Sequence, residues 1–189
     1  MYKNLMIDIE TLSKKHNASI ISIAAIPFDN EFNISKKIFY QNINLDSCLK
    51  QGADIETETL TWWIENNHKL LQQMLTKDTM DIGIALIKLN EFIDINLHND
   101  FFIWAKGTTF DLSKLKYYYE IFKISCPWHY KFERCIRTFL HDKNEYSLNI
   151  DLNFTNIRNF FSLDNNIILD NHNPIVDCYY QIKVLDKLS

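Results

Sequence analysis

Two apolar segments near the start of the sequence, residues 3–10 and 19–28, set the strongest limit on the fold. The first contains two acids, Asp8 and Glu10, at alternate positions, so a strand would point both carboxylates to one face and its apolar side chains to the other. Like charges on a half-buried face repel each other and lose hydration unless a cation lies between them. An edge strand whose second face is in water is the commoner explanation of a lone D-x-E pattern, so the rest of the chain has to decide.

The order of the expected elements indicates an α/β fold. Residues 34–43 form a third apolar segment, and the short polar connections between the three predict antiparallel strands. We then expect helices over 57–75, 81–97, 110–122 and 171–188, a buried strand over 101–105, and a short strand running into a helix within 131–140. Three antiparallel strands followed by this alternation predict a mixed sheet with helices packed on it, in one domain spanning 1–189. The Asn-rich stretch 141–173 shows no clear pattern.

Composition narrows the class of protein. With 47% apolar and 23% charged residues, the 189-residue chain has the profile of a soluble globular protein. Its net charge of -4 means that any contact with nucleic acid needs a local basic patch. Four cysteines without a C-x-x-C pair predict free thiols in a reducing cytosol. The sequence shows no leader or membrane span, and we therefore expect a soluble, cytoplasmic protein.

Two aromatic segments lie on expected helices. In the 57–75 helix, Thr57 or Thr59 is the expected cap, and Leu60, Trp63 and Ile64 share one side. One tryptophan of an adjacent pair on a helix is more often core, which favours a buried Trp63. The segment YYYEIF, residues 117–122, is aromatic on all sides. It favours helix packing or a subunit contact, which leaves a homodimer open.

Further acids occur at the starts of two later helices. Asp111 follows a buried strand and a glycine turn, and the carboxyl ends of such strands are where open α/β sheets place their active sites. Asp177 falls in the first turn of the last helix, where Asn173 is a cap and Pro174 occupies the first helical position. Taken singly, either aspartate could simply stabilise a helix N-terminus. His172 lies just before the last helix and could converge with Asp177, although alone it could be a solvent-exposed histidine.

The combination is more specific than its parts. The order D-x-E, F-D and H-x4-D resembles the DEDDh branch of the DnaQ-like 3′–5′ exonucleases, which have a ribonuclease H-like fold with helices on both faces of a mixed sheet. Over nearly the whole chain the similarity is to the group containing the phage exonuclease A proteins and a mycobacterial 3′–5′ exoribonuclease. It includes "TETLTWWIENN", "WAKGTTFDLSKL" and "ERCIRTFL". A tyrosine-type relative would need Tyr at position 173, which is Asn here.

The resemblance implies two Mg²⁺ or Mn²⁺ ions held by carboxylates. Asp8 would bridge both ions, Glu10 and Asp177 would complete the first site, and Asp111 would hold the second, largely through water. His172 would be the general base that takes a proton from the attacking water. Hard oxygen ligands suit these cations, and the cations in turn neutralise the clustered acids.

Several residues are candidates for contacts with the substrate. By the resemblance, Thr11 and Leu12 would touch the terminal nucleotide. Trp62 could stack a base, and Phe110 could wedge beside the scissile nucleotide or simply pack beneath Asp111. The candidate phosphate contacts are Arg134, Arg137 and Lys106.

The predicted activity is 3′–5′ hydrolysis of single-stranded nucleic acid to nucleoside 5′-monophosphates. DNA is favoured because of the likeness to the phage proteins, and an exoribonuclease is the near alternative, since no contact to a 2′ hydroxyl is identifiable. A catalytically silent ribonuclease H-like module that binds nucleic-acid ends or protein partners is a rival from another class. An endonuclease on the same fold is a further alternative.

Overall fold

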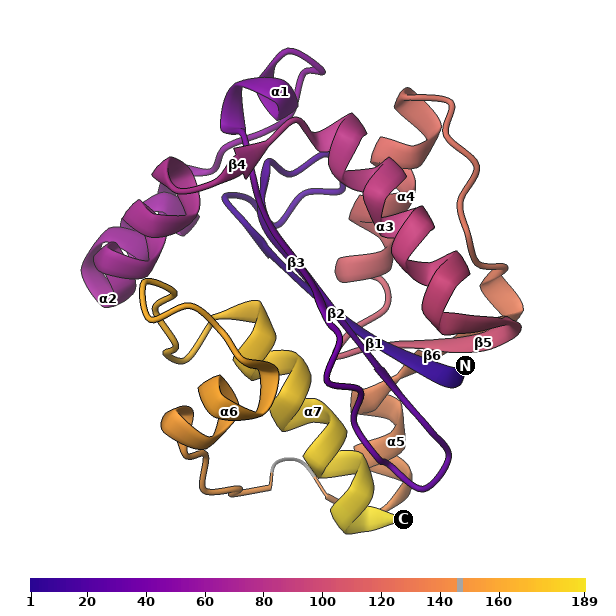
Figure 1. Cartoon of the computed structure of the whole chain (residues 1–189). Coiled ribbons are helices and arrows are strands. Elements are labelled where there is room, and N and C mark those ends of the chain that lie inside the picture. The colour runs from indigo at the N-terminus through magenta and orange to yellow at the C-terminus, as the bar shows by residue number, and fades with distance from the viewer. Residues whose placement is uncertain (146–147) are drawn as a thin grey trace.

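In the computed structural model, which describes residues 1–145 and 148–189, six strands form one sheet in the order β4-β3-β2-β1-β5-β6 (Figure 1). The pairs β1–β2 and β2–β3 are antiparallel, whereas β1–β5, β5–β6 and β3–β4 are parallel. The strands are β1 Tyr2–Thr11, β2 Ile20–Phe28, β3 Phe39–Ile43, β4 Thr79–Met80, β5 Leu97–Ala105 and β6 Glu133–Cys135. The predicted mixed α/β sheet is confirmed.

Helices cover both faces of this sheet (Figure 1). The α-helices are α1 Leu45–Leu49, α2 Thr57–Thr76, α3 Ile82–Asn96, α4 Asp111–Ile121, α5 Ile136–Asp142, α6 Phe154–Phe161 and α7 Pro174–Leu188. Side chains of α3 and α4 share one buried cluster with the sheet, and those of α5, α6 and α7 share another on the opposite face. None of the helices in the described residues is long and apolar enough to cross a membrane.

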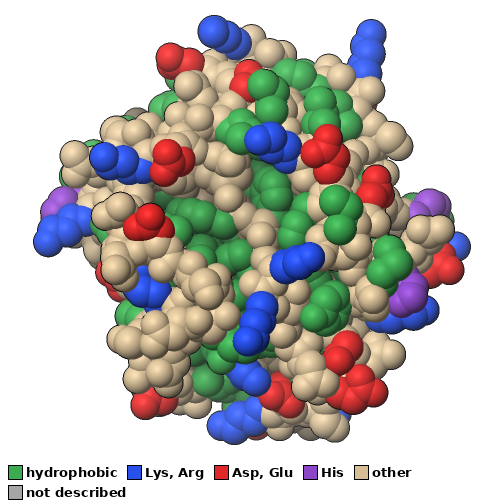
Figure 2. Space-filling model, in the orientation of Figure 1, with side chains coloured by type: hydrophobic (Ala, Val, Ile, Leu, Met, Phe, Trp, Pro, Cys, Tyr) green, Lys and Arg blue, Asp and Glu red, His purple; other side chains and the backbone are tan. Residues whose placement is uncertain are grey.

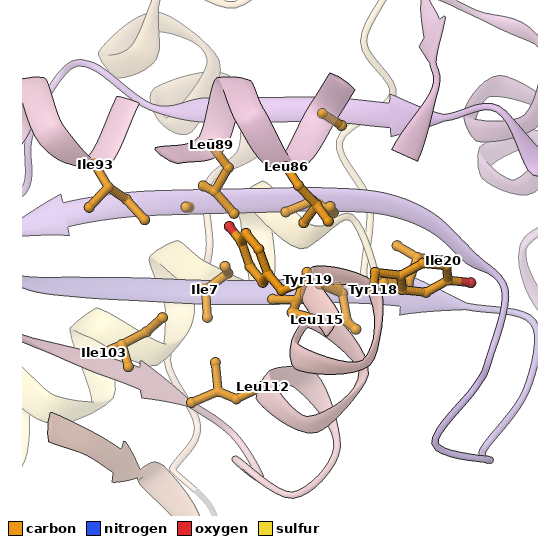
Figure 3. Packing of buried hydrophobic residues seen from close by; sticks show 14 of the residues in the cluster. Ile7, Ile20, Leu86, Leu89, Ile93, Ile103, Leu112, Leu115, Tyr118 and Tyr119 are labelled. Atoms are coloured by element: carbon orange, nitrogen blue, oxygen red, sulfur yellow. The ribbon is translucent and has the colours of Figure 1, made fainter. Parts of the chain in front are cut away.

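Alternation along β1 decides which face carries the acids. Leu5, Ile7 and Ile9 are buried beneath α3 and α4, and Figure 3 shows the α3 and α4 side chains pointing toward the strands there. Met6 lies in the cluster on the other face, toward α7, so Asp8 and Glu10 lie on that face as well. Because β1 is paired on both sides, by β2 and β5, an edge strand is excluded as the explanation of the D-x-E pattern.

Several predicted elements differ in detail from the structure, and β5, for example, begins at Leu97 and not at residue 101. The third strand covers Phe39–Ile43 only, because residues 34–38 meet β2 through a single bridge, Ile34 with Phe28. The cap of α2 is Glu56 rather than Thr57 or Thr59. The Glu56 carboxylate accepts hydrogen bonds from the Lys14 backbone N–H and the Thr59 hydroxyl, and so ties the helix start to the loop after β1.

The buried side of α2 is also narrower than predicted. Trp63 is 2% exposed and belongs to the core as expected, but Ile64 is 54% exposed. The buried side consists of Trp63, Leu70, Leu71 and Met74, and the helix is broken at Asn67, which has non-helical backbone angles. Ile64 therefore points to solvent although it neighbours Trp63.

The Asn-rich stretch contains a helix that the sequence pattern did not indicate. Asn153 caps α6 by accepting a hydrogen bond from the Asn156 backbone N–H, and the side chains of Ile157 and Phe161 are buried. These two residues join the cluster around α7. Residues 146–147 of this stretch lie outside the described residues.

Charges of both signs are interspersed on the face that Figure 2 shows. This agrees with the modest net charge of -4. Any contact with a polyanion on this face therefore has to come from cations placed individually at a site.

Candidate active site

Four carboxylates and a histidine from three regions of the chain line one pocket. Asp8 and Glu10 come from β1, Asp111 begins α4, Asp177 lies in the first turn of α7, and His172 precedes that helix. The pocket has a volume of about 320 Å³, and its other lining residues are Ile9, Lys106, Phe110, Arg137, Tyr180 and Gln181. The structure thus brings together the five residues that the sequence singled out from distant positions.

Local geometry places each aspartate at the start of a helix. The chain turns after β5 at Gly107, and the Asp111 carboxylate accepts a hydrogen bond of 3.3 Å from the Ile9 backbone N–H. At α7 the Asn173 side chain accepts a hydrogen bond of 2.9 Å from the Ile175 backbone N–H, with Pro174 in the first turn, as predicted. Asp177 is then directed at the acids of β1 because α7 packs along β1 and β2.

The loop before α7 holds His172 close to two of the acids. One ligand atom each of Glu10, His172 and Asp177 lies within 4.8 Å of the others. The His172 backbone has a φ of 67°, a left-handed conformation, and its ring meets the Trp62 ring edge-on at 4.8 Å between centroids. This packing fixes which way the imidazole faces.

Helix α2 anchors the same loop through amide side chains. The Asn67 amide donates a hydrogen bond of 2.9 Å to the backbone carbonyl of Asn171. Gln73 accepts one of 2.8 Å from the backbone N–H of Ile168 and also bonds the Asn166 carbonyl. The break in α2 at Asn67 thus faces the residue just before His172, so the helix that carries Trp62 also positions the histidine.

Burial and mutual repulsion disfavour the charged form of these acids. Burial, followed by repulsion from Asp111 and Asp177, raises the pKa of the Asp8 carboxyl well above its usual value. Burial raises the pKa of Glu10 in the same way, with the Asp8 charge as the next cause. Burial also raises the pKa of Asp111 to about 7 and that of Asp177 above its usual range. The charges of Lys106 and Arg137 lower three of these pKa values but do not offset the burial, so additional cations would stabilise the charged acids.

Sequence reasoning missed Gln181, the direct partner of Asp8. Its side-chain N–H donates a hydrogen bond of 3.0 Å to Asp8 Oδ1 and lowers the pKa of that carboxyl against the larger effect of burial. Its Oε1 is buried and has no hydrogen-bond partner among the described residues. Gln181 stands four residues after Asp177 on α7, and this one-turn spacing is the signal that could have found it.

A second pocket adjoins the carboxylates. It has a volume of about 390 Å³ and shares Glu10, Phe110 and His172 with the first pocket. Trp62, which is 39% exposed, lines it together with Thr11. The remaining lining residues are Ser13, Lys14, Glu58, Thr59 and Trp63.

Two sequence-based substrate contacts need correction. Leu12 is 1% exposed and packs with Ile21 and Trp63, and its backbone N–H and carbonyl are both used in hydrogen bonds, so it is a core residue. The Arg134 guanidinium lies over the Phe102 ring and donates hydrogen bonds to two nearby backbone carbonyls. Its register beside Trp104 and Met6 puts Arg134 on the face of the acids, but these contacts hold its guanidinium outside the carboxylate pocket. Arg137, Lys106 and Phe110 do line the carboxylate pocket.

A mixed sheet of this order, with acids gathered beside its first strand and last helix, has the ribonuclease H-like fold of exonuclease I. The chain belongs to the family of the 3′-5′ exoribonuclease Rv2179c-like domain, whose sequence model matches residues 3–188. The predicted family and enzyme class are therefore confirmed. A search of curated proteins found no match.

Solved structures with the same fold are distant in sequence. The zinc-bound complex of E. coli exonuclease I with single-stranded DNA superposes with a TM-score of 0.65 at 11% identity, over 98% of this chain and 40% of that one. Exonuclease X in complex with 5′ overhanging duplex DNA gives 0.54 at 14% identity, over 98% and 90%. Cell-death related nuclease 4 gives 0.53 at 12% identity, over 99% and 64%. The chain thus spans about two fifths of the exonuclease I chain, and the likeness concerns the fold.

Proposed function

We propose that this chain removes nucleoside 5′-monophosphates from the 3′ ends of single-stranded nucleic acid. The observation that carries the proposal is the convergence of four acids and His172 on one pocket, beside a second pocket that presents Trp62. The first pocket gathers oxygen donors where a phosphodiester could be cut, and the second offers an aromatic surface where a terminal base could stack.

The donor set fits divalent cations. The acids supply hard carboxylate oxygens, and burial, the largest cause of their raised pKa values, means that their charged forms need nearby cations. Asp8, Glu10, Asp111 and Asp177 would hold two Mg²⁺ or Mn²⁺ ions. Such ions, when bound, lower the pKa of water and stabilise charge on a phosphoryl oxygen.

The protein's own residues would then orient the reaction. We assign to His172 the removal of a proton from the attacking water, because its ring faces Glu10 and Asp177. Thr11 and Trp62 would bind the terminal nucleoside, and Phe110, which lines both pockets, would form the wall beside the scissile phosphate. Arg137 would contact phosphate.

The sugar of the substrate has two candidates. Single-stranded DNA is the expectation from the sequence. RNA is the other candidate, because the description of the family names an exoribonuclease domain. Both sugars therefore belong in the first experiment.

That experiment follows 5′-labelled single-stranded DNA and RNA with Mg²⁺ or Mn²⁺, using the wild type, Asp8→Asn and a matched control, Asp94→Asn. Asp94 is exposed on α3, away from the pocket. We expect stepwise shortening from the 3′ end by the wild type and the control. For Asp8→Asn we expect the rate of shortening to fall by about 100-fold or more. Binding without shortening would support the silent module, and cleavage of circular single strands would support an endonuclease.

A further inference from the structure

Two cations line the carboxylate pocket without a carboxylate partner. Lys106 and Arg137 both line this pocket, and their charges lower the pKa of nearby acids, but neither forms an ion pair with an acid in the part of the chain that the structure describes. Both are exposed, and Tyr180 of α7 lines the same side of the pocket. Unpaired cations beside an aromatic ring are the features that single-stranded nucleic-acid sites use.

The turn between β5 and α4 is shaped around these groups. Gly107 has a φ of 119°, and a Cβ added there would lie 3.1 Å from Arg137 Nη1. The bare glycine backbone thus leaves room for the guanidinium from α5. Its neighbour Lys106 extends toward α7, where its Nζ lies 5.9 Å from the centre of the Tyr180 ring.

The path of a substrate strand follows from the two pockets, if the proposed function holds. A terminal nucleoside against Trp62 places the scissile phosphate at the shared residues Glu10, Phe110 and His172. The strand must then leave on the opposite side of the acids. Lys106, Arg137 and Tyr180 line the carboxylate pocket but not the pocket of Trp62, which is where a departing strand would pass.

We infer that Lys106, Arg137 and Tyr180 form a subsite for the penultimate nucleotide. After cleavage this nucleotide carries the new 3′ hydroxyl of the shortened strand. Lys106 and Arg137 bind its phosphate, and the Tyr180 ring supports its base or sugar. The Tyr180 hydroxyl is already bonded to the Leu148 carbonyl, so the ring and not the hydroxyl faces the substrate. The inference rests on the proposed function and adds a second nucleotide to the recognised substrate.

The test compares a substrate that fills this subsite with one that does not. A short oligonucleotide places its penultimate nucleotide in the subsite. The p-nitrophenyl ester of a nucleoside 5′-monophosphate has no penultimate nucleotide and places only its p-nitrophenolate leaving group on that side. We expect Lys106→Met and Tyr180→Ala to lower kcat/KM for the oligonucleotide about 10-fold more than for the ester. Lys106→Arg and Tyr180→Phe should restore the oligonucleotide rate, and Lys106→Met should reduce the slope of log affinity against log salt by about 1.

Lys131→Met is the matched control, because Lys131 also lies over an aromatic ring, that of Phe132, but outside both pockets. It should change neither rate. Equal losses on both substrates, or no loss on either, would overturn the subsite. If the wild type cuts the oligonucleotide but not the ester, binding is measured instead of rate. The variants should then lose affinity for an oligonucleotide but not for a mononucleotide. A wild type that cuts no nucleic acid at all refutes the proposed function itself.

Discussion

At the scale of single residues, the most informative contact is between Gln181 and Asp8. Asp8 is buried among other acids, and the Gln181 amide is the one side-chain donor that reaches it among the described residues. The contact occupies Oδ1 and fixes the plane of the carboxylate. A carboxylate fixed in this way presents its remaining oxygen in one direction, which is what a cation site requires.

Gln181→Met should therefore weaken metal binding without unfolding the protein. Met fills a similar volume but cannot donate a hydrogen bond. We expect the affinity for Mn²⁺, measured by calorimetry, to fall by about 10-fold, as is typical for loss of a residue that orients a ligand. Gln72→Met, at an exposed position of α2, should leave the affinity unchanged. Unaltered Mn²⁺ binding by Gln181→Met would show that Asp8 needs no such support.

His172→Ala should separate a base from a metal ligand. Because Glu10, His172 and Asp177 lie close enough together to share an ion, both roles are geometrically open. We assign the base role and expect the hydrolysis rate to fall by about 100-fold or more while Mn²⁺ affinity stays near that of the wild type. His98→Ala, at an exposed position of β5, serves as the control. A parallel loss of Mn²⁺ affinity would instead make His172 a ligand.

At the scale of elements, the turn between β5 and α4 combines two demands on one glycine. Gly107 has a φ of 119°, outside the left-handed helical region that other residues can enter, and it also contacts Arg137 closely. Gly52 has a φ of 75° and nothing within 4 Å of an added Cβ. The two glycines therefore differ in both backbone strain and crowding.

Gly107→Ala should cost more stability than Gly52→Ala. For Gly52→Ala we expect a loss of about 1 kcal/mol in the free energy of unfolding, and for Gly107→Ala about 2–3 kcal/mol, both measured by urea denaturation. Exonuclease activity should fall only for Gly107→Ala, because only there is Arg137 displaced. Equal costs would mean that neither the backbone angle of Gly107 nor its contact with Arg137 adds to the loss.

Local sequence patterns predicted some elements of the site, whereas features that depend on distant contacts were missed. Alternation in β1 and the Asn-Pro start of α7 are local patterns, and they placed Asp8, Glu10 and Asp177 correctly. Helix α6 was missed because only two of its residues, Ile157 and Phe161, are buried, and they are buried by contact with α7, which is distant in sequence. Leu12 was misread for a related reason, since its neighbours Ile21 and Trp63 are distant in sequence.

At the scale of the whole molecule, the acids link stability to pH and to metal. The pKa of Asp111 rises from 3.8 to about 7 on folding, and those of the other three acids rise as well. The folded protein therefore holds protons that the unfolded chain releases. Its stability is greatest at the acid end of this range and falls as pH rises from about 4 through about 7.

Metal should reverse this loss. In the metal-free protein we expect the melting temperature to drop between pH 5 and pH 8, and we expect Mg²⁺ or Mn²⁺ to raise it more at pH 8 than at pH 5, because the cations bind the deprotonated acids. Scanning calorimetry with and without metal measures both effects. Asp111→Asn should flatten the pH dependence. A metal-induced increase that is the same at both pH values would contradict the link.

The order of the acids along the chain has a consequence for synthesis. Asp8 leaves the ribosome early, whereas Asp177 emerges only with α7, which packs back onto β1 and β2. A nascent chain that has already paired β1 with β2 still lacks one side of the cation pocket. Under the proposed activity, the growing polypeptide therefore stays inactive until α7 has docked.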